Sequence, residues 1–265
     1  MRRTLGLLVA TVALMTTGCR DDHVTITYQP RPGAAYEYTI HVVSSTTSAF
    51  PGSPASQPPV VPADITARHR VLDASDGTTR VEVQLEREGL GQRTFVMRFD
   101  RAAQLTAVES VEGIPAEALG SLGLSEIFPV AAGAPPDRRL RPGDRWVIDD
   151  QVQLAGMDAP ARLSGTGRLV QLGVVDGHKT ATVSSTTTLP LTATSTTSDG
   201  VQTLTGTQTT TITVVYDLAD GAVRHSTATT SASYDVMLNP PTGRAGAPIK
   251  GSLTVKLQSE TRRSG

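Results

Sequence analysis

The five histidines are the first candidates for acid–base or metal chemistry in this sequence. They are His23, His41, His69, His178 and His225. None has another histidine two or four residues away, a spacing that would put two imidazoles on one face of a strand or helix as a metal pair. His69 lies between Arg68 and Arg70, where an anion site is one possibility. We interpret these three residues as a solvated strand face.

A second candidate is the carboxylate pair Asp149 and Asp150, with Asp144 nearby, which could hold calcium or transfer protons. The segment lacks the glycine-punctuated loop and terminal glutamate of a calcium site, so we expect an exposed strand end. The chain also contains no nucleophile elbow, phosphate-binding loop, zinc helix or dinucleotide fingerprint. We therefore predict no catalytic residue, no metal site and no cofactor.

The remaining reactive residue is Cys19, the one cysteine of the chain. It follows two arginines, Arg2 and Arg3, an apolar run from Leu5 to Met15, and three small residues. The apolar run is well short of the roughly 20 residues that a helix needs to cross a bilayer. This order of segments is typical of a secretory signal peptide covering residues 1–18.

The small residues that run directly into Cys19 resemble the lipobox of bacterial lipoproteins. The resemblance implies that the Cys19 sulfur receives a diacylglycerol and that the signal is cut just before it. The mature protein would then be lipid-anchored on the outer side of a bacterial cell membrane or in the outer envelope. Several acyl chains hold a protein firmly to a bilayer.

Charge excludes nucleic acid as a partner. Removal of Arg2 and Arg3 with the signal leaves 22 basic against 25 acidic residues, a net charge of −3. Such a mildly acidic surface without a basic patch offers no electrostatic footprint for nucleic acid. With a single cysteine, no disulfide can form within the chain.

The elements that must position any site are strands. Segments rich in Val, Ile, Thr and Tyr alternate apolar with polar residues, as in "TRVEVQLERE" at 79–88, and this period of two predicts half-buried antiparallel strands. Asp-Gly pairs lie between these segments, and such pairs predict hairpin turns. The Thr- and Ser-rich tract at 180–213 is either a glycosylated stalk or a hairpin around Asp199-Gly200, and we favour the hairpin. Pro115 and the apolar spacing in 114–128 predict one helix, with Leu119 and Leu122 buried beneath it.

An internal repeat divides the chain. "RPGAAY" at 31–36 returns as "RPGDRW" at 141–146, and two further pairs of landmarks follow in the same order. The repeat predicts that Tyr36 is equivalent to Trp146, and Phe99 to Tyr216.

The predicted fold is mainly β, with antiparallel curved sheets or a partial barrel built from two similar halves. We expect a signal peptide at 1–18, a lipidated tether and first strand at 19–30, a β-rich half at 31–113, a helical insert and linker at 114–140, a second half at 141–260 and a tail at 261–265. A duplicated β-rich body loosely resembles uncharacterised bacterial lipoproteins. More weakly, it is similar to lipoprotein carriers and lipid-transfer lipoproteins, whose curved sheet wraps an apolar cavity.

These observations favour a non-catalytic lipoprotein that is anchored to the membrane and binds or carries an apolar or amphiphilic ligand at the cell envelope. One alternative is a structural or adhesive envelope protein without a small ligand. A third is an enzyme whose catalytic residues are not close in sequence.

Overall fold

The computed structural model describes most of the chain after residue 22. The described residues are 23–52, 60–75, 77–89, 91–103, 105–115, 134–152, 161–197, 200–240 and 247–264. Every helix or strand assigned within these residues is a strand. The strands are β1 Ala35–Ala49, β2 Val61–Ser75, β3 Thr78–Arg87, β4 Gly91–Asp100, β5 Leu105–Val111, β6 Ile114–Pro115, β7 Arg145–Val152, β8 Ala161–Val175, β9 His178–Thr197, β10 Gly200–Asp217, β11 Val223–Asn239 and β12 Ile249–Ser264.

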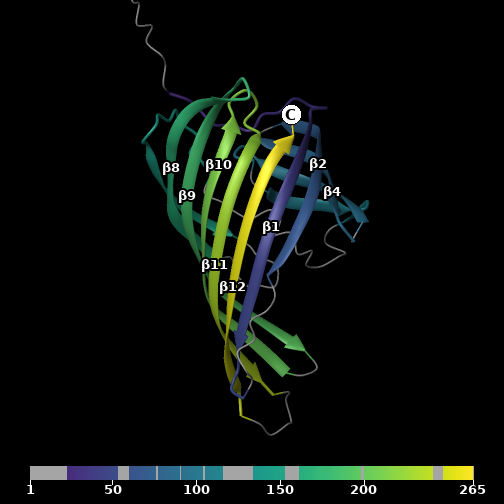
Figure 1. Cartoon of the computed structure of the whole chain (residues 1–265), viewed down its shortest axis with the longest axis vertical. Helices are drawn as coiled ribbons and strands as arrows, with labels where there is room; N and C mark the ends of the chain where they lie inside the picture. Colours follow the sequence, from purple (N-terminus) through teal and green to yellow (C-terminus); the bar gives the residue numbers. More distant parts are fainter. Residues whose placement is uncertain are drawn as a thin grey trace, which may run out of the picture.

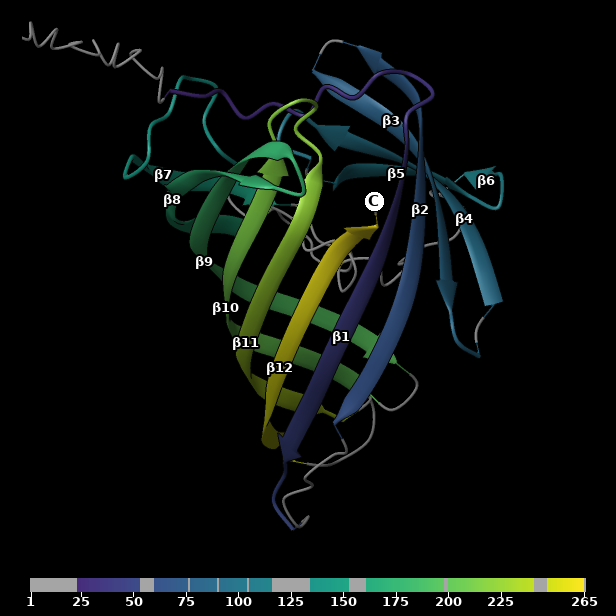
Figure 2. The same cartoon turned by 45° about the horizontal axis from the view of Figure 1, so that its top comes forward.

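These strands form one antiparallel sheet in the order β6-β5-β4-β3-β2-β1-β12-β11-β10-β9-β8-β7. The sheet is strongly curved, with the first half and the second half of the chain on either side of β1 and β12 (Figures 1 and 2). It is not closed, and β6 and β7 are its edges in the described part of the chain. The predicted mainly-β fold with a curved antiparallel sheet is therefore confirmed.

Each half is a meander of six strands, and the backbone contacts of the first half recur in the second. The N–H of Gly33 donates to the carbonyl of Val71 at 2.9 Å, and that of Gly143 to the carbonyl of Leu169 at 2.8 Å. A β-bulge follows Val71 in β2, and another follows Leu169 in β8. Gly33 and Gly143 both have positive φ, which glycine adopts without steric cost. The two predicted halves are thus built alike.

The predicted residue equivalences hold. Tyr36 and Trp146 each lie three residues after one of these glycines, at the start of β1 and β7. Phe99 and Tyr216 each precede an aspartate at a strand end, whose carboxylate accepts the backbone N–H two residues further on, at 2.8 and 3.0 Å. The strand that follows begins with a matching register shift in both halves.

Three predicted boundaries need correction. A helix is expected from the sequence at 114–128. Its first two residues, 114–115, form the strand β6 instead, because they pair with Ser110 and Val111 of β5. The rest of that helix, with Leu119 and Leu122, lies outside the described residues. The first strand expected before residue 30 is reduced to a bridge between Val24 and Leu140. The tail expected at 261–265 is strand as far as Ser264, because β12 continues its pairing with β1.

The Thr- and Ser-rich tract is a hairpin, as predicted. β9 pairs with β10 from Thr180↔Asp217 to Thr197↔Gly200. Threonine suits a strand because its branched side chain packs well on a pleated surface. The tract thus supplies two of the longest strands in the sheet.

The core lies on the inner face of the curved sheet and has two parts. In β3 the alternation seen in the sequence holds, with Val81, Val83 and Leu85 buried. One cluster belongs mainly to the first half and one to the second. The first includes Tyr28, Tyr38, Ile40, Ile65, Val81, Val83, Phe95, Met97 and Phe99. The second includes Ile26, Leu140, Trp146, Ile148, Leu163, Leu169, Val183, Ile212, Val214 and Tyr216.

The segment 23–30 crosses the end of the sheet from one half to the other (Figure 2). Backbone hydrogen bonds join Val24 to Leu140, Tyr28 to Arg101 at 2.6 Å, and Gln29 to Asp220 at 2.8 Å. Ile26 packs into the second-half cluster and Tyr28 into the first-half cluster. This segment therefore ties the two halves together at the end where the chain enters the sheet.

We predict that Gly167→Ala destabilises the fold. Gly167 in β8 lies directly opposite Trp146, and a Cβ there would overlap the indole ring. Overpacking of this kind costs about 1–3 kcal/mol. Unfolding followed by Trp146 fluorescence checks it, since Trp146 is the one tryptophan of the chain. Gly173→Ala in the same strand is the control, because its Cβ makes an ordinary 3.6 Å contact with Thr180 Oγ1. Equal stabilities of the two variants would contradict the packing described.

Candidate functional site

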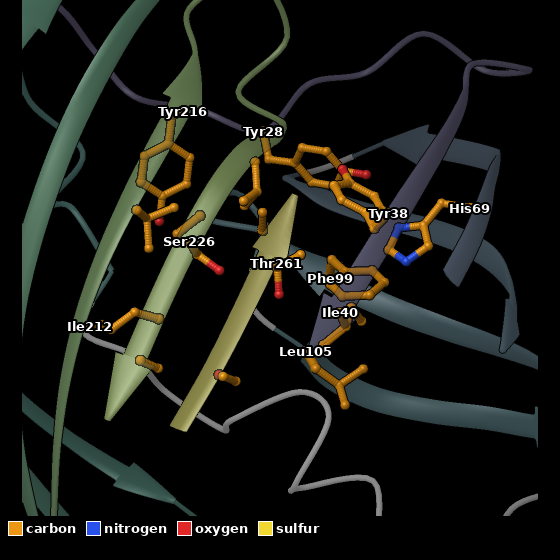
Figure 3. A pocket seen from close by; sticks show the side chains of 16 residues that line it. Tyr28, Tyr38, Ile40, His69, Phe99, Leu105, Ile212, Tyr216, Ser226 and Thr261 are labelled. Carbon is orange, nitrogen blue, oxygen red and sulfur yellow. The ribbon is translucent and has the colours of Figure 1, made fainter. Parts of the chain in front are cut away.

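A cavity of about 140 Å³ lies between the two halves on the inner face of the sheet (Figure 3). Its described walls come from the segment before β1, from β1, β2, β4 and β5 of the first half, and from β10, β11 and β12 of the second. The lining residues are Tyr28, Tyr38, Ile40, His69, Phe99, Ala102, Ala103, Leu105, Ile212, Val214, Tyr216, Val223, Ser226, Ala228, Ser259 and Thr261.

The pairing of β1 with β12 explains which side chains face the cavity. Ile40 pairs with Thr261, and Thr261 pairs in turn with Ser226 of β11. Directly paired residues project to the same face of a sheet, and every second residue does so along a strand. The inner positions of three neighbouring strands therefore converge on one space.

The cavity has walls of different chemistry. The rings of Tyr28, Tyr38 and Phe99 gather with His69 on one side, and Ile212 and Tyr216 lie on the opposite side (Figure 3). The remaining wall carries hydroxyl groups, which are those of Ser226, Ser259 and Thr261. The cavity can thus accept an apolar ring or chain and also hydrogen-bond a polar group attached to it.

The aromatic wall is held by ring contacts. The Tyr38 ring lies 4.8 Å from the His69 ring between centroids, and the Phe99 ring lies 6.0 Å from it. Tyr28 and Phe99 meet edge to face at 6.4 Å. Such offset or edge-to-face pairs are favoured over stacked faces, so these ring contacts hold the wall in place.

Burial keeps the phenol groups of this wall neutral. It raises the pKa of Tyr28 above its ordinary value, with a smaller contribution from the negative charge of Asp220. Burial likewise raises the pKa of Tyr38 and of Tyr216. A phenol that holds its proton can donate a hydrogen bond but cannot act as a base at neutral pH.

His69 faces the cavity, contrary to the solvated position expected from its arginine neighbours. Strand alternation puts Arg68 and Arg70 outside and His69 inside, on the same face as Ile65 and Ala67. Burial lowers the pKa of His69 to about 4. The imidazole is therefore neutral at physiological pH and takes no part in an anion site, whereas Arg68 and Arg70 are on a solvated strand face as expected.

A cluster of charged side chains around Asp217 lies where β10, β11 and β12 meet the end of the sheet. Burial acts to raise the pKa of Asp217, but the Ala219 N–H, Arg224 and Arg263 donate hydrogen bonds to it, and the net result is a lowered pKa. Arg224 lies 3.2 Å and Arg263 2.9 Å from Asp217 Oδ2. Arg263 also lies over the Tyr36 ring, whose hydroxyl donates to Asp220 at 2.8 Å. The cluster joins β10, β11 and β12 to β1 and serves to hold these elements together.

The other candidate catalytic or metal-binding residues do not form a common site. Asp149 and Asp150 are exposed on β7, as expected, and hydrogen bonds from Arg162 lower the pKa of Asp149. His41 contacts Asp64 at 2.6 Å and His225 contacts Glu260 at 3.0 Å, both on the outer face. Within the described ranges no three His, Cys, Asp or Glu residues are grouped as a metal site. Cys19 lies outside the described residues.

Comparison with known proteins adds no relative. No family model matches the sequence, and no curated protein matches it. Among the described residues, no helix has the length and apolar character needed to cross a membrane.

We predict that His69 makes the fold less stable in mild acid. Its folded pKa of about 4 lies below the ordinary value of 6.5. The unfolded chain thus binds more protons between these values, and stability falls as the pH is lowered through this window. Between about pH 7.5 and pH 5, the free energy of unfolding should drop about 1–2 kcal/mol more in the parent than in His69→Asn. Urea denaturation at the two pH values measures this, and identical pH dependence of the two proteins would contradict the burial of His69.

Proposed function

We propose that this chain is an extracytoplasmic lipoprotein that is anchored to the membrane through Cys19 and binds a small apolar or amphiphilic ligand in the cavity between its halves. The observation that carries the proposal is the cavity itself. It crosses the junction of the halves, and rings and aliphatic side chains line most of it.

The size of the cavity limits the ligand. An apolar cavity of about 150 Å³ in another protein accepts benzene or xenon. The space here, about 140 Å³, thus suits one ring or a short acyl segment rather than a whole lipid. The hydroxyls of Ser226, Ser259 and Thr261 would bind a polar group next to that segment, which favours an amphiphile over a pure hydrocarbon.

The chemistry of the lining residues supports binding rather than catalysis. A general base works best with a pKa near the operating pH. His69, the lining imidazole, has a pKa of about 4, and the lining phenols have raised pKa values. Without such a base beside them, the serine and threonine hydroxyls of the wall are suited to hydrogen bonding rather than to nucleophilic attack.

A structural or adhesive role without a small ligand is the second candidate. It is favoured by the extent of the packed inner face, since two large clusters of buried side chains lie on it beside the cavity. The hydroxyl-rich outer face of β9 and β10 would then be the contact surface. Detection of a molecule bound in the cavity distinguishes the two candidates.

The anchor is tested by Cys19→Ser. We expect the variant to carry no diacylglycerol and to keep its signal, so that it migrates as a precursor, since the sulfur is the site of acylation in the lipobox family. Mass spectrometry of the amino-terminal peptide from cell membranes measures both changes. A variant that is processed normally and stays firmly bound to membranes would overturn the anchor.

Ligand binding is tested by Ala228→Leu, which adds a larger side chain from β11 into the cavity. We expect the protein purified from membranes to carry a small molecule and the variant to carry much less. Its stability should be kept, because the new side chain occupies a space rather than packed atoms. Native mass spectrometry and thermal melting are the measurements.

The control is Thr229→Leu, the neighbouring residue, which is exposed on the outer face of β11. It should retain the bound molecule in full. Equal ligand content in the two variants, or none in the parent, would contradict the binding function and favour the structural one.

A further inference from the structure

The internal repeat allows the outer faces of the two halves to be compared at equivalent positions. In the first half, Arg70 of β2 lies opposite Ala35 of β1 and opposite Glu82 of β3. Its guanidinium donates to both carboxylate oxygens of Glu82 at 3.0 Å. The charge at this position is therefore neutralised within the sheet.

The second half keeps the arginine and replaces both neighbours. Arg168 of β8 lies opposite Arg145 of β7 and opposite Ser184 of β9. Arg145 thus stands where the first half has Ala35, and Ser184 stands where it has Glu82. Like charges directly opposite one another destabilise a sheet, and within the described residues neither Arg145 nor Arg168 has an ion-pair partner.

Other charges of the first-half outer face are replaced in the same way. Glu37 pairs with Arg68 at 3.0 Å, whereas the residue equivalent to Glu37 is Val147, which is 79% exposed. Val170, at the β-bulge two residues after Arg168, is also exposed. The two arginines thus have exposed apolar neighbours instead of carboxylates.

Three more arginines lie just before β7. Arg138 donates to the carbonyl of Arg145 at 3.4 Å, and Arg139 and Arg141 are exposed beside it. Asp144 accepts contacts from Arg138 and Arg141, both at 3.5 Å. We call this set the arginine surface. It comprises Arg138, Arg139, Arg141, Arg145 and Arg168 with Val147 and Val170.

The entry of the chain into the sheet lies at the arginine surface. Val24 and Leu140 form a two-way backbone bridge at 2.8 Å, and Arg139 donates to the carbonyl of His23 at 3.4 Å. Four residue steps separate His23 from Cys19, which at most span about 14 Å. A lipid on Cys19 would hold this part of the sheet close to the bilayer.

We propose that the arginine surface docks on the phosphate headgroups of an anionic lipid bilayer, with Val147 and Val170 at the boundary between headgroups and acyl chains. The position of the surface relative to the membrane rests on the anchor of the proposed function. The need for an anionic partner rests separately on the uncompensated arginine pair. Basic side chains near an anionic membrane surface each add to the attraction, and lipid phosphates relieve the repulsion between Arg145 and Arg168.

A fluorophore at Thr166→Cys tests the docking. Thr166 is exposed on β8 opposite Val147, and a matched label at Thr39→Cys lies on the exposed outer face of β1. Acylated Cys19 has no free thiol, so each variant takes one label. The labelled lipoproteins are reconstituted into vesicles of phosphatidylcholine, with or without an equal part of phosphatidylglycerol, that carry spin-labelled headgroups.

We expect stronger quenching at residue 166 than at residue 39, in phosphatidylglycerol vesicles and at low salt. Arg145→Ala and Ser184→Glu each restore the first-half charge pattern at one position. Each should weaken docking about fivefold, the effect of one charge at an anionic surface. Arg93→Ala, which removes an exposed charge near the start of β4 in the first half, should leave docking unchanged.

Equal quenching at the two labels, or quenching at residue 166 that is indifferent to phosphatidylglycerol, would overturn the proposal and leave an acidic protein as the partner of the arginine surface. Mass spectrometry of Cys19 separates this result from a failed anchor. If Cys19 carries no lipid, its thiol is free, so the two label sites are placed in a Cys19→Ser background and these proteins are added to the vesicles from solution. Quenching at residue 166 that depends on phosphatidylglycerol then upholds the arginine surface, and its absence overturns it.

Discussion

The pairing of β1 with β12 is the interaction on which the rest of the structure depends. It runs from Glu37↔Ser264 to Ala49↔Ser252 and joins the first strand of one half to the last strand of the other. Without it the halves would be two separate meanders, each with an additional open edge. With it, one sheet curves around two core clusters, and the inner positions of β1, β11 and β12 meet in a shared cavity.

The internal repeat makes it possible to compare the side chains of the two halves at equivalent positions. Their backbones agree in turns, bulges and strand order, although the strands β9 to β12 are longer than β3 to β6. Side chains at equivalent positions near these shared turns can therefore be compared directly. On the outer face the first half carries ion pairs such as Arg70–Glu82 and Arg80–Glu109. The second half keeps Arg162–Asp149 but has arginine opposite arginine at Arg145 and Arg168. Exposed ion pairs contribute little to stability, so the absence of the Arg70–Glu82 type of pair from the second half costs the fold little.

The sequence predicted the features that depend on local pattern. Alternation and Asp-Gly turns predicted the strands, and the returning Pro-Gly opener predicted the equivalence of Tyr36 and Trp146. The same alternation could have put His69 inside, since it continues the series of Ile65 and Ala67; the flanking arginines misled the interpretation. The position and the lining residues of the cavity could not be predicted, because they depend on β1 meeting β12 more than 200 residues later, and no local signal specifies that partner.

The central claim is that the junction of the halves leaves a preformed space for a small apolar group. Crystals of the protein exposed to xenon under pressure test it most directly, because xenon enters apolar cavities of this size and is located by its anomalous scattering. The account predicts a xenon atom among Tyr38, Phe99, Ile212 and Val214. A cavity filled by protein side chains, with no xenon at the junction, would contradict it.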